Sequence, residues 1–236
     1  MKKRPSRHAI ITGDIVASRK ITPGIRQELY NNLNLFLKSL TKDKWLISYQ
    51  TFRGDSIQCE VRSLQQSLRV ALMIKSFVMR YIPRATKKSL KDAHPKRPLL
   101  TRGYFNIGYD IRLAVGIGEV DFIGKGKSAT SDGPAFQLSG HALDSLKDQN
   151  ILLALKTGDA ELNEELAVII SLLDAVTQKW TQNQAELTLY KLKLKRDEEI
   201  SRILEISLSA VNQRKRNAQW TAIEKAVQFF ETKIEL

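Results

Sequence analysis

The spacing of hydrophobic residues changes in a regular order along the first three quarters of the chain, and this order restricts the fold more than any other feature. Apolar residues alternate or run together where a strand is expected, and recur every three or four positions where a helix is expected. The expected elements are a strand at 8–15, a helix from 23 to about 40, strands at 45–51 and 56–61, a helix at 64–79, a strand at 111–117, a helix at about 132–147, a strand at 151–156 and a helix at 162–180. The sequence therefore predicts an α+β fold of the ferredoxin-like or palm type, an antiparallel sheet with helices on one face.

After Trp180 the pattern changes to short helical runs only, at 182–194 and 196–206, with a third run from 207 to 220. The third run either ends near Trp220 or continues to the end of the chain. We therefore expect two domains, a palm-like domain over 1–177 and an all-α helix-turn-helix domain over 178–236. A segment rich in proline and basic residues, 83–104, is expected to be a loop of the first domain.

The charge is distributed unevenly over the 236 residues, whose net charge is +13. Residues 1–100 contain 21 basic and 6 acidic side chains, residues 101–177 contain 6 and 11, and residues 178–236 contain 11 and 8. A basic excess attracts nucleic acids through their phosphates, but it also serves solubility alone. The charge therefore leaves both interpretations open.

Cysteine content and hydrophobic runs exclude several classes of protein. Cys59 is the single cysteine, so an intrachain disulfide or a zinc site built from several cysteines is excluded, and a reducing cytoplasm is the expected location. No run of about 18 apolar residues is present, so we expect no membrane insertion.

Two aspartates stand at positions where the predicted fold brings chain segments together. Asp14 ends the first strand, and Asp55 follows Gly54 in the predicted hairpin. In the palm order the first strand lies beside the hairpin, so the two carboxylates can converge on a hydrated Mg²⁺ ion. Ordinary turn or capping chemistry explains each aspartate equally well when it is taken alone.

Four segments, ITGDIVASRK, FRGDSIQCEV, IRLAVGIGEV and SDGPAFQLSGHALD, resemble in this order the successive motifs of the SatD family. More distantly they look like the catalytic palm of class III nucleotide cyclases and of the GGDEF diguanylate cyclases. The resemblance covers about residues 8–157. It implies a nucleotide cyclase-like palm with a nucleotide or another phosphate-bearing compound as ligand.

The resemblance also implies roles for particular residues. Asp14, the backbone carbonyl of Ile15 and Asp55 would hold Mg²⁺, and the backbone around Ala17, Ser18 and Arg19 would bind a triphosphate. Gln137 and His141 stand where the cyclases have an asparagine and a charge-stabilising arginine, which makes them the candidate catalytic positions. Because a neutral histidine replaces a fixed cation, and fixed cations often contribute most to transition-state stabilisation, we expect cyclase turnover to be absent.

The stretch 197–220 resembles the bacterial helix-turn-helix of sigma-factor region 4 and of response regulators. Ile200, Ile203 and Leu204 would pack the first helix, a turn would follow near Ile206, and Ser209 could cap the second helix. Polar side chains suited to bases and phosphates would then face outward from the second helix. These expected DNA-binding residues are Ser209, Asn212, Gln213, Lys215 and Arg216.

Three functions are compatible with these observations. The first is a DNA-binding regulator, expected to be a homodimer, whose palm domain senses a phosphate-bearing ligand or serves as a dimerisation platform. The second is a metal-dependent enzyme acting on nucleotides through Asp14 and Asp55. The third is a scaffold whose helical tail only dimerises. We favour the first.

Overall fold

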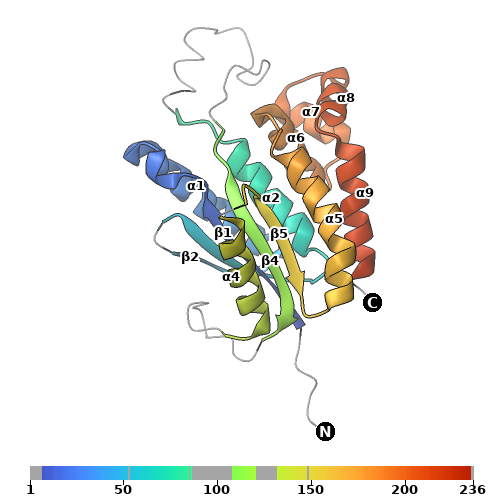
Figure 1. Ribbon diagram of the computed structural model, residues 1–236. Coiled ribbons are helices and arrows are strands. Elements are labelled where there is room, and N and C mark those ends of the chain that lie inside the picture. Colours follow the sequence, from blue (N-terminus) through green and yellow to red (C-terminus); the bar gives the residue numbers. More distant parts are fainter. Residues whose placement is uncertain are drawn as a thin grey trace.

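The structure is a computed structural model that describes residues 7–52, 54–84, 86, 108–120, 132–147 and 149–234. A five-stranded sheet forms its centre, and helices surround the sheet (Figure 1). The elements are β1 (Arg7–Ile15), a short 3-10 helix η1 (Ser18–Lys20), α1 (Pro23–Lys42), β2 (Leu46–Phe52), β3 (Ser56–Val61), α2 (Ser67–Met79), β4 (Ile111–Glu119), α4 (Pro134–Leu146), β5 (Leu153–Thr157), α5 (Ala160–Thr177), α6 (Gln182–Leu192), α7 (Asp197–Leu204), α8 (Leu208–Asn217) and α9 (Trp220–Lys233).

The strand order of the sheet is β2-β3-β1-β4-β5. Strand β1 pairs antiparallel with both β3 and β4, and β2 pairs antiparallel with β3. The elements β1, α1, β2, β3, α2 and β4 therefore have the expected ferredoxin-like arrangement, with the β2–β3 hairpin on one side of β1 and β4 on the other. Strand β5 is added parallel to β4, which requires a crossover connection such as α4.

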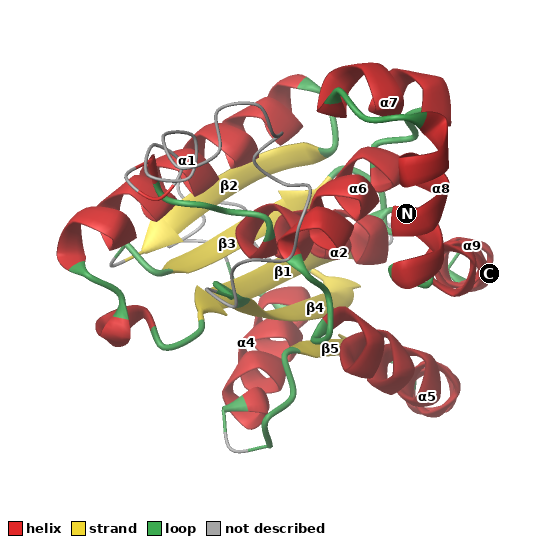
Figure 2. Cartoon of the chain, turned by 90° about the horizontal axis from the view of Figure 1, so that it is seen from above, coloured by secondary structure: helices red, strands yellow, loops and turns green. Residues whose placement is uncertain are grey.

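The expectation that helices cover only one face of the sheet is wrong. Helices α1, α2 and α5 pack on one face, whereas α4 packs on the opposite face over β1, β4 and β5 (Figure 2). Small residues on alternate positions of β4 allow this second layer. A Cβ at Gly116 would overlap the backbone of Ala135 and Ser139 in α4, so only glycine permits the observed contact.

The main core lies between the sheet and the helices of the α1–α2 side. Apolar side chains of α1 recur on one face and are buried with the alternate residues of β1, β3 and β4. Every side chain of α2 is buried, because this helix lies between the sheet and α6. The ring of Phe36 stacks on that of Phe77, with centroids 4.1 Å apart, and so joins α1 to α2.

The main core continues into the C-terminal helices. Side chains of α6 and α9, including Leu189, Trp220 and Phe230, belong to the same cluster as the sheet. A separate small core joins α6, α7 and α8 through Leu187, Ile200 and Val211. The proposed boundary at residue 177 coincides with the end of α5, and one continuous core spans it.

The third helical run of the tail ends before Trp220. Gln219 adopts a left-handed conformation (φ +57°) between α8 and α9, so two helices replace a single long one. No described helix is both long and apolar enough to cross a membrane. The basic segment expected to form a loop at 83–104 lies mostly outside the described residues.

Candidate functional site

Asp14 is held by an arginine on the neighbouring strand. In the sheet register Asp14 lies opposite Ser56 of β3 and Arg112 of β4. The guanidinium of Arg112 donates from Nε to Asp14 Oδ1 at 2.9 Å and from Nη2 to Oδ2 at 2.7 Å, and these hydrogen bonds raise the pKa of Arg112. Both carboxylate oxygens therefore already face a fixed positive charge in bidentate geometry.

Asp55 has different partners at the hairpin. Its backbone oxygen accepts a hydrogen bond from the N–H of Ile15 (3.0 Å), and its Oδ2 accepts one from the hydroxyl of Ser18 (2.8 Å). Gly54 adopts φ +82°, and a Cβ there would lie 3.0 Å from the ring of Tyr30 in α1. Burial raises the pKa of Tyr30, and the charge of Asp55 raises it further.

The two carboxylates point to opposite faces of the sheet. Asp14 lies on the α4 face with Thr12, whose hydroxyl contacts that of Ser139, and its charge acts on Lys147 at the end of α4. The carboxylate of Asp55 lies on the α1 side, bound to Ser18. Asp55 itself belongs to the turn just before β3, and its hydrogen bond with Ser18 and its charge interaction with Tyr30 place its carboxylate beside α1.

The residues present do not fit the Mg²⁺ ion that the resemblance implies. A Mg²⁺ ion needs converging oxygen ligands in octahedral geometry. Here both oxygens of Asp14 accept hydrogen bonds from Arg112, and the carboxylate of Asp55 is bound to Ser18 on the other side of the sheet. Within the described residues, no three His, Cys, Asp or Glu side chains gather to hold a metal ion. The described residues at this end of the sheet therefore do not form a magnesium site.

The expected phosphate-binding loop, at residues 17–19, is held by contacts within the protein. Ala17 adopts a left-handed conformation (φ +50°) just before η1, which is a strained arrangement for a residue other than glycine. The side chain of Ser18 is buried and its hydroxyl donates a hydrogen bond to Asp55, whereas Arg19 and Lys20 are exposed. The loop thus offers two exposed cations to solvent rather than a set of converging hydroxyls.

The two candidate catalytic positions face away from this end of the sheet. Gln137 and His141 are exposed on α4, one turn apart. Ser139 lies on the opposite side of the same helix and contacts Thr12 in the sheet. The structure therefore does not bring Gln137 or His141 toward Asp14 or Asp55.

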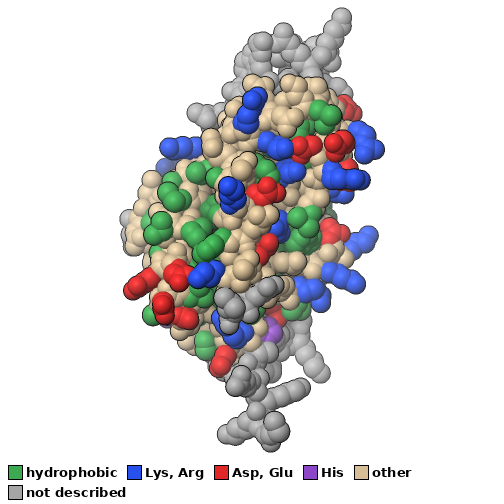
Figure 3. Space-filling view, turned by 90° about the vertical axis from the view of Figure 1, so that its right-hand side faces the viewer, with side chains coloured by type: hydrophobic (Ala, Val, Ile, Leu, Met, Phe, Trp, Pro, Cys, Tyr) green, Lys and Arg blue, Asp and Glu red, His purple; other side chains and the backbone are tan. Residues whose placement is uncertain are grey.

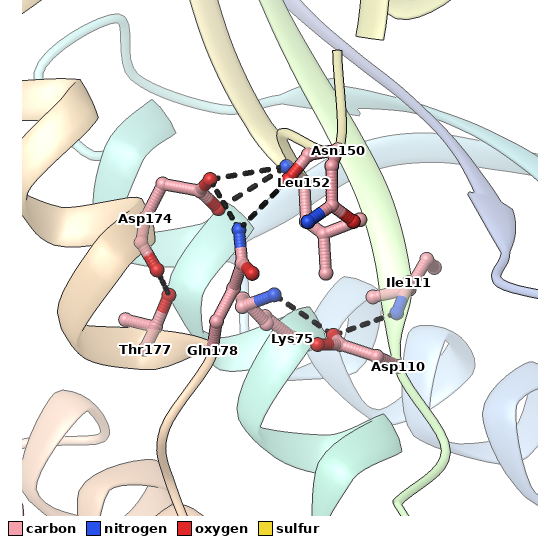
Figure 4. A network of polar contacts seen from close by, with 8 residues as sticks. All are labelled: Lys75, Asp110, Ile111, Asn150, Leu152, Asp174, Thr177 and Gln178. Carbon is pink, nitrogen blue, oxygen red and sulfur yellow. Dashed lines mark hydrogen bonds and ion pairs between the residues drawn. The ribbon is translucent and has the colours of Figure 1, made fainter. Parts of the chain in front are cut away.

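A buried polar network, which the sequence did not reveal, fixes the ends of β1, β4 and β5 (Figure 4). Lys75 is fully buried in α2, and its Nζ lies 2.8 Å from Asp110 Oδ1. The same oxygen accepts a hydrogen bond from the N–H of Ile111, and the backbone oxygen of Asp110 accepts one from Val16. A lysine within the apolar pattern of α2 is the sequence signal that could have pointed to this pair.

Asp174 of α5 completes the network at the start of β5. Its carboxylate accepts hydrogen bonds from the N–H of Leu152 (3.2 Å) and from Gln178 Nε2 (2.6 Å). Burial raises the pKa of Asp174, although these hydrogen bonds and the charge of Lys75 oppose the rise. The network stabilises the end of the sheet, and its polar groups bond to one another within the protein.

Helices α7 and α8 form a compact pair joined by a tight turn. Glu205 takes the left-handed conformation (φ +53°) that glycine often supplies at such a turn. Ser207, and not Ser209 as expected, caps α8 by accepting a hydrogen bond from the N–H of Ala210. Ile200 is buried as expected, but Ile203 is 47% exposed and does not contribute to the packing.

One face of α8 presents polar side chains to solvent. Ser209, Asn212, Gln213 and Arg216 are all exposed, and their spacing of three, four and seven positions places them on a single helical face. Lys215 lies off this face and donates to Asp197 Oδ2 at 2.6 Å. Burial raises the pKa of Asp197, but hydrogen bonds from Lys215 and Lys191 outweigh burial and lower it.

The inward side of α8 anchors the helix. Val211 is fully buried, and Arg214 turns toward Glu186 of α6, with Nη1 and Oε2 4.0 Å apart. Arg80, at the end of α2, lies 3.4 Å from the other oxygen of Glu186. The carboxylate of Glu186 therefore lies between two arginines and ties α8 to the helices over the sheet.

The family model described as "SatD family" matches residues 105–224, slightly more than half of the chain. The chain belongs to the SatD family. The matched region runs from just before β4 into α9 and therefore includes Arg112 as well as the α7–α8 pair. No curated protein shows significant similarity to the chain.

Solved structures of nucleotide cyclases show partial similarity. A bacterial light-regulated adenylyl cyclase has 15% sequence identity and a TM-score of 0.36 over 65% of this chain and 77% of its own. The adenylyl cyclase CyaB from P. aeruginosa has 14% identity and a TM-score of 0.34 over 61% and 74%. The guanylyl cyclase Cya2 has 12% identity and a TM-score of 0.36 over 61% and 73%.

Proposed function

We propose that this SatD-family protein is a DNA-binding regulator in which α7 and α8 form a helix-turn-helix and α8 reads the major groove. The sheet domain then acts as a sensor of a phosphate-bearing ligand or as a dimerisation platform, without cyclase turnover. The observation that carries the proposal is the exposed face of α8, with Ser209, Asn212, Gln213 and Arg216 on one side of a well-anchored helix.

The chemistry of this face suits base edges. Asparagine and glutamine amides match adenine, an arginine guanidinium matches guanine, and a serine hydroxyl contacts either. A helix that reads bases must be held rigidly, and α8 is held by the buried Val211 and by Arg214 against Glu186. Lys215, tied to Asp197, would position the helix rather than read bases.

The phosphate backbone would be contacted largely by other parts of the chain. Residues 178–236 carry only a small basic excess, whereas residues 1–100 carry 21 basic and 6 acidic side chains. Non-specific affinity for DNA depends on the number of phosphates neutralised. We therefore expect base selection to depend on α8 and much of the salt dependence on the basic first hundred residues.

A selection experiment tests the proposal. A pool of random-sequence duplexes is incubated with the full chain at about 50 mM salt, where phosphate contacts are strong, and the bound DNA is sequenced. The wild type is expected to enrich one site, and Asn212→Ala/Gln213→Ala/Arg216→Ala to enrich none and to bind that site at least about tenfold more weakly. Lys38→Ala, which removes one exposed positive charge from α1, is the matched control and should select the wild-type site. Equal selection by the triple variant would refute the proposal, as would no enrichment by the wild type.

The metal-dependent enzyme is not retained as a second candidate. Asp14 and Asp55 lie on opposite faces of the sheet and are bound to Arg112 and Ser18. No contact of the described residues favours nucleotidyl transfer.

A further inference from the structure

An exposed apolar face on α5 and α9 remains unexplained by DNA binding. Val168 and Leu172 of α5 are 64% and 63% exposed, and Phe229 of α9 is 41% exposed. Figure 3 faces this side of the molecule, and hydrophobic side chains gather there next to a group of acidic ones. Large apolar side chains exposed together on a soluble domain often mark an interaction surface.

The exposed positions of α5 follow a heptad-like spacing. Steps of four and three residues alternate along one face, and every residue on it is exposed. This face consists of Glu161, Glu165, Val168, Leu172 and Ala175 of α5, and the exposed Lys179 continues the spacing in the turn that follows the helix. It is acidic at its start and apolar in its middle, over a helix about 27 Å long at 1.5 Å per residue, and a basic residue follows just beyond the end of the helix.

We propose that this face binds a second copy of the chain, with the two α5 helices antiparallel about a two-fold axis near Ile170. In this register Val168 packs against Leu172 of the partner subunit. Glu161 then faces Lys179 of the partner subunit, and the two-fold axis repeats both contacts. An isologous interface needs such self-complementarity.

The charge pattern selects an antiparallel copy over a parallel one. A parallel pair would bring the acidic starts of both helices together, and like charges side by side are unfavourable. Glu165 needs no cation from the partner, because Lys233 of its own chain lies 2.7 Å from it. Its counterpart in the antiparallel register is Ala175 of the partner subunit, which leaves room for this ion pair.

The neighbouring residues allow the helices to come close. Ala167 and Ser171 flank the heptad-like face and are exposed, and small side chains permit close packing of two helices. Phe229 widens the apolar area toward α9, where Lys233 Nζ lies 5.7 Å from its ring centroid. This surface is separate from the α8 face, so the inference does not rest on the proposed function.

The first test measures the oligomeric state of the full chain without DNA by sedimentation and light scattering. The wild type is expected to be a dimer, and Leu172→Asp to raise the dissociation constant by about 100-fold, because it buries a carboxylate in the apolar centre. Leu35→Asp is the matched control, since Leu35 of α1 is also 63% exposed, and it should remain a dimer. A wild type that stays monomeric up to about 100 µM, or equal behaviour of both variants, would overturn the proposal.

A charge-exchange test addresses the register. Glu161→Lys and Lys179→Glu should each weaken the dimer about tenfold, since each places like charges at both symmetric contacts. Mixing the two variants should give a heterodimer in which both contacts are again of opposite sign. If the mixture associates no better than the separate variants, the antiparallel register is wrong. Because no DNA is present, either result leaves the DNA-binding proposal to its own test.

Discussion

The end of the sheet and the outer face of α8 are both rich in polar side chains, but those of the sheet end are paired within the protein and those of α8 are exposed to solvent. At the sheet end the charges are matched within the protein, with Arg112 on Asp14 and Lys75 on Asp110. On α8, Asn212, Gln213 and Arg216 are exposed to solvent, and of these Asn212 accepts a hydrogen bond from Lys215 at 3.5 Å. The comparison shows that the residues of a binding motif indicate a site only when their polar groups are not already satisfied by the fold.

The largest expected difference between the two regions concerns stability. Asp110→Ala leaves the fully buried ammonium of Lys75 without its carboxylate partner, which should lower the free energy of unfolding by about 3–5 kcal/mol in urea titrations. Asp144→Ala breaks an exposed pair with Lys147 and serves as the control, with an expected loss below about 1 kcal/mol. Equal losses would mean that the buried pair does not support the sheet end.

The Asp14–Arg112 pair should give an intermediate effect. Arg112→Ala removes two hydrogen bonds to a half-buried carboxylate, for an expected loss of about 1–3 kcal/mol. Neither the wild type nor this variant is expected to bind Mn²⁺ at about millimolar concentration in calorimetry, because Asp55 lies on the other face of the sheet. Tight binding by the wild type would contradict the geometry described above.

The pH dependence of the free energy of unfolding should distinguish the buried Asp174 from an exposed aspartate. The pKa of Asp174 is raised in the folded state, so the folded protein binds the proton of this carboxyl more strongly than the unfolded chain does. Proton binding by Asp174 therefore stabilises the fold below the ordinary aspartate pKa. This contribution to the free energy of unfolding declines as the pH rises through the raised pKa. Asp174→Asn should remove this decline in urea titrations from about pH 4 to about pH 7. Asp159→Asn at the start of α5 is a comparison variant that should keep it. An unchanged decline in Asp174→Asn would show that other groups cause it.

The smallest expected effect concerns the turn before α8. Glu205 has φ +53°, a conformation that costs most residues free energy but suits glycine. Glu205→Gly should therefore raise the free energy of unfolding by about 0.5–1 kcal/mol without weakening DNA binding. Glu198→Gly, within α7, should instead lower it by a similar amount. A loss of stability in Glu205→Gly would show that the side chain of Glu205, rather than its backbone, matters.

Most of the fold could be predicted because its signals are local. The periodicity of β1, α1 and the β2–β3 hairpin located these elements to within a few residues. The position of α4 on the second face was missed, since it depends on the contact of Gly116 with Ala135, which no local pattern reveals. The start of α8 was placed at Ser209 rather than Ser207 because both serines are good capping residues.

The candidate sites differ in predictability for the same reason. The exposed face of α8 follows from helical spacing within ten residues. Whether the carboxylate of Asp14 is free to bind a ligand depends on Arg112, which is 98 positions away in the sequence. Arg112 becomes a neighbour of Asp14 only through the register of β1 and β4. A charge pair formed across a sheet can be recognised only once the strand register is known.

Hydrogen exchange of the full chain, with and without its selected duplex, distinguishes DNA binding at α8 from DNA binding at the sheet end. DNA is expected to slow exchange in residues 205–217 and to leave exchange in residues 14–20 and 54–56 unchanged. Slower exchange at 14–20 and 54–56 with no change at 205–217 would contradict this expectation and would place the nucleic acid, or its phosphates, at the sheet end.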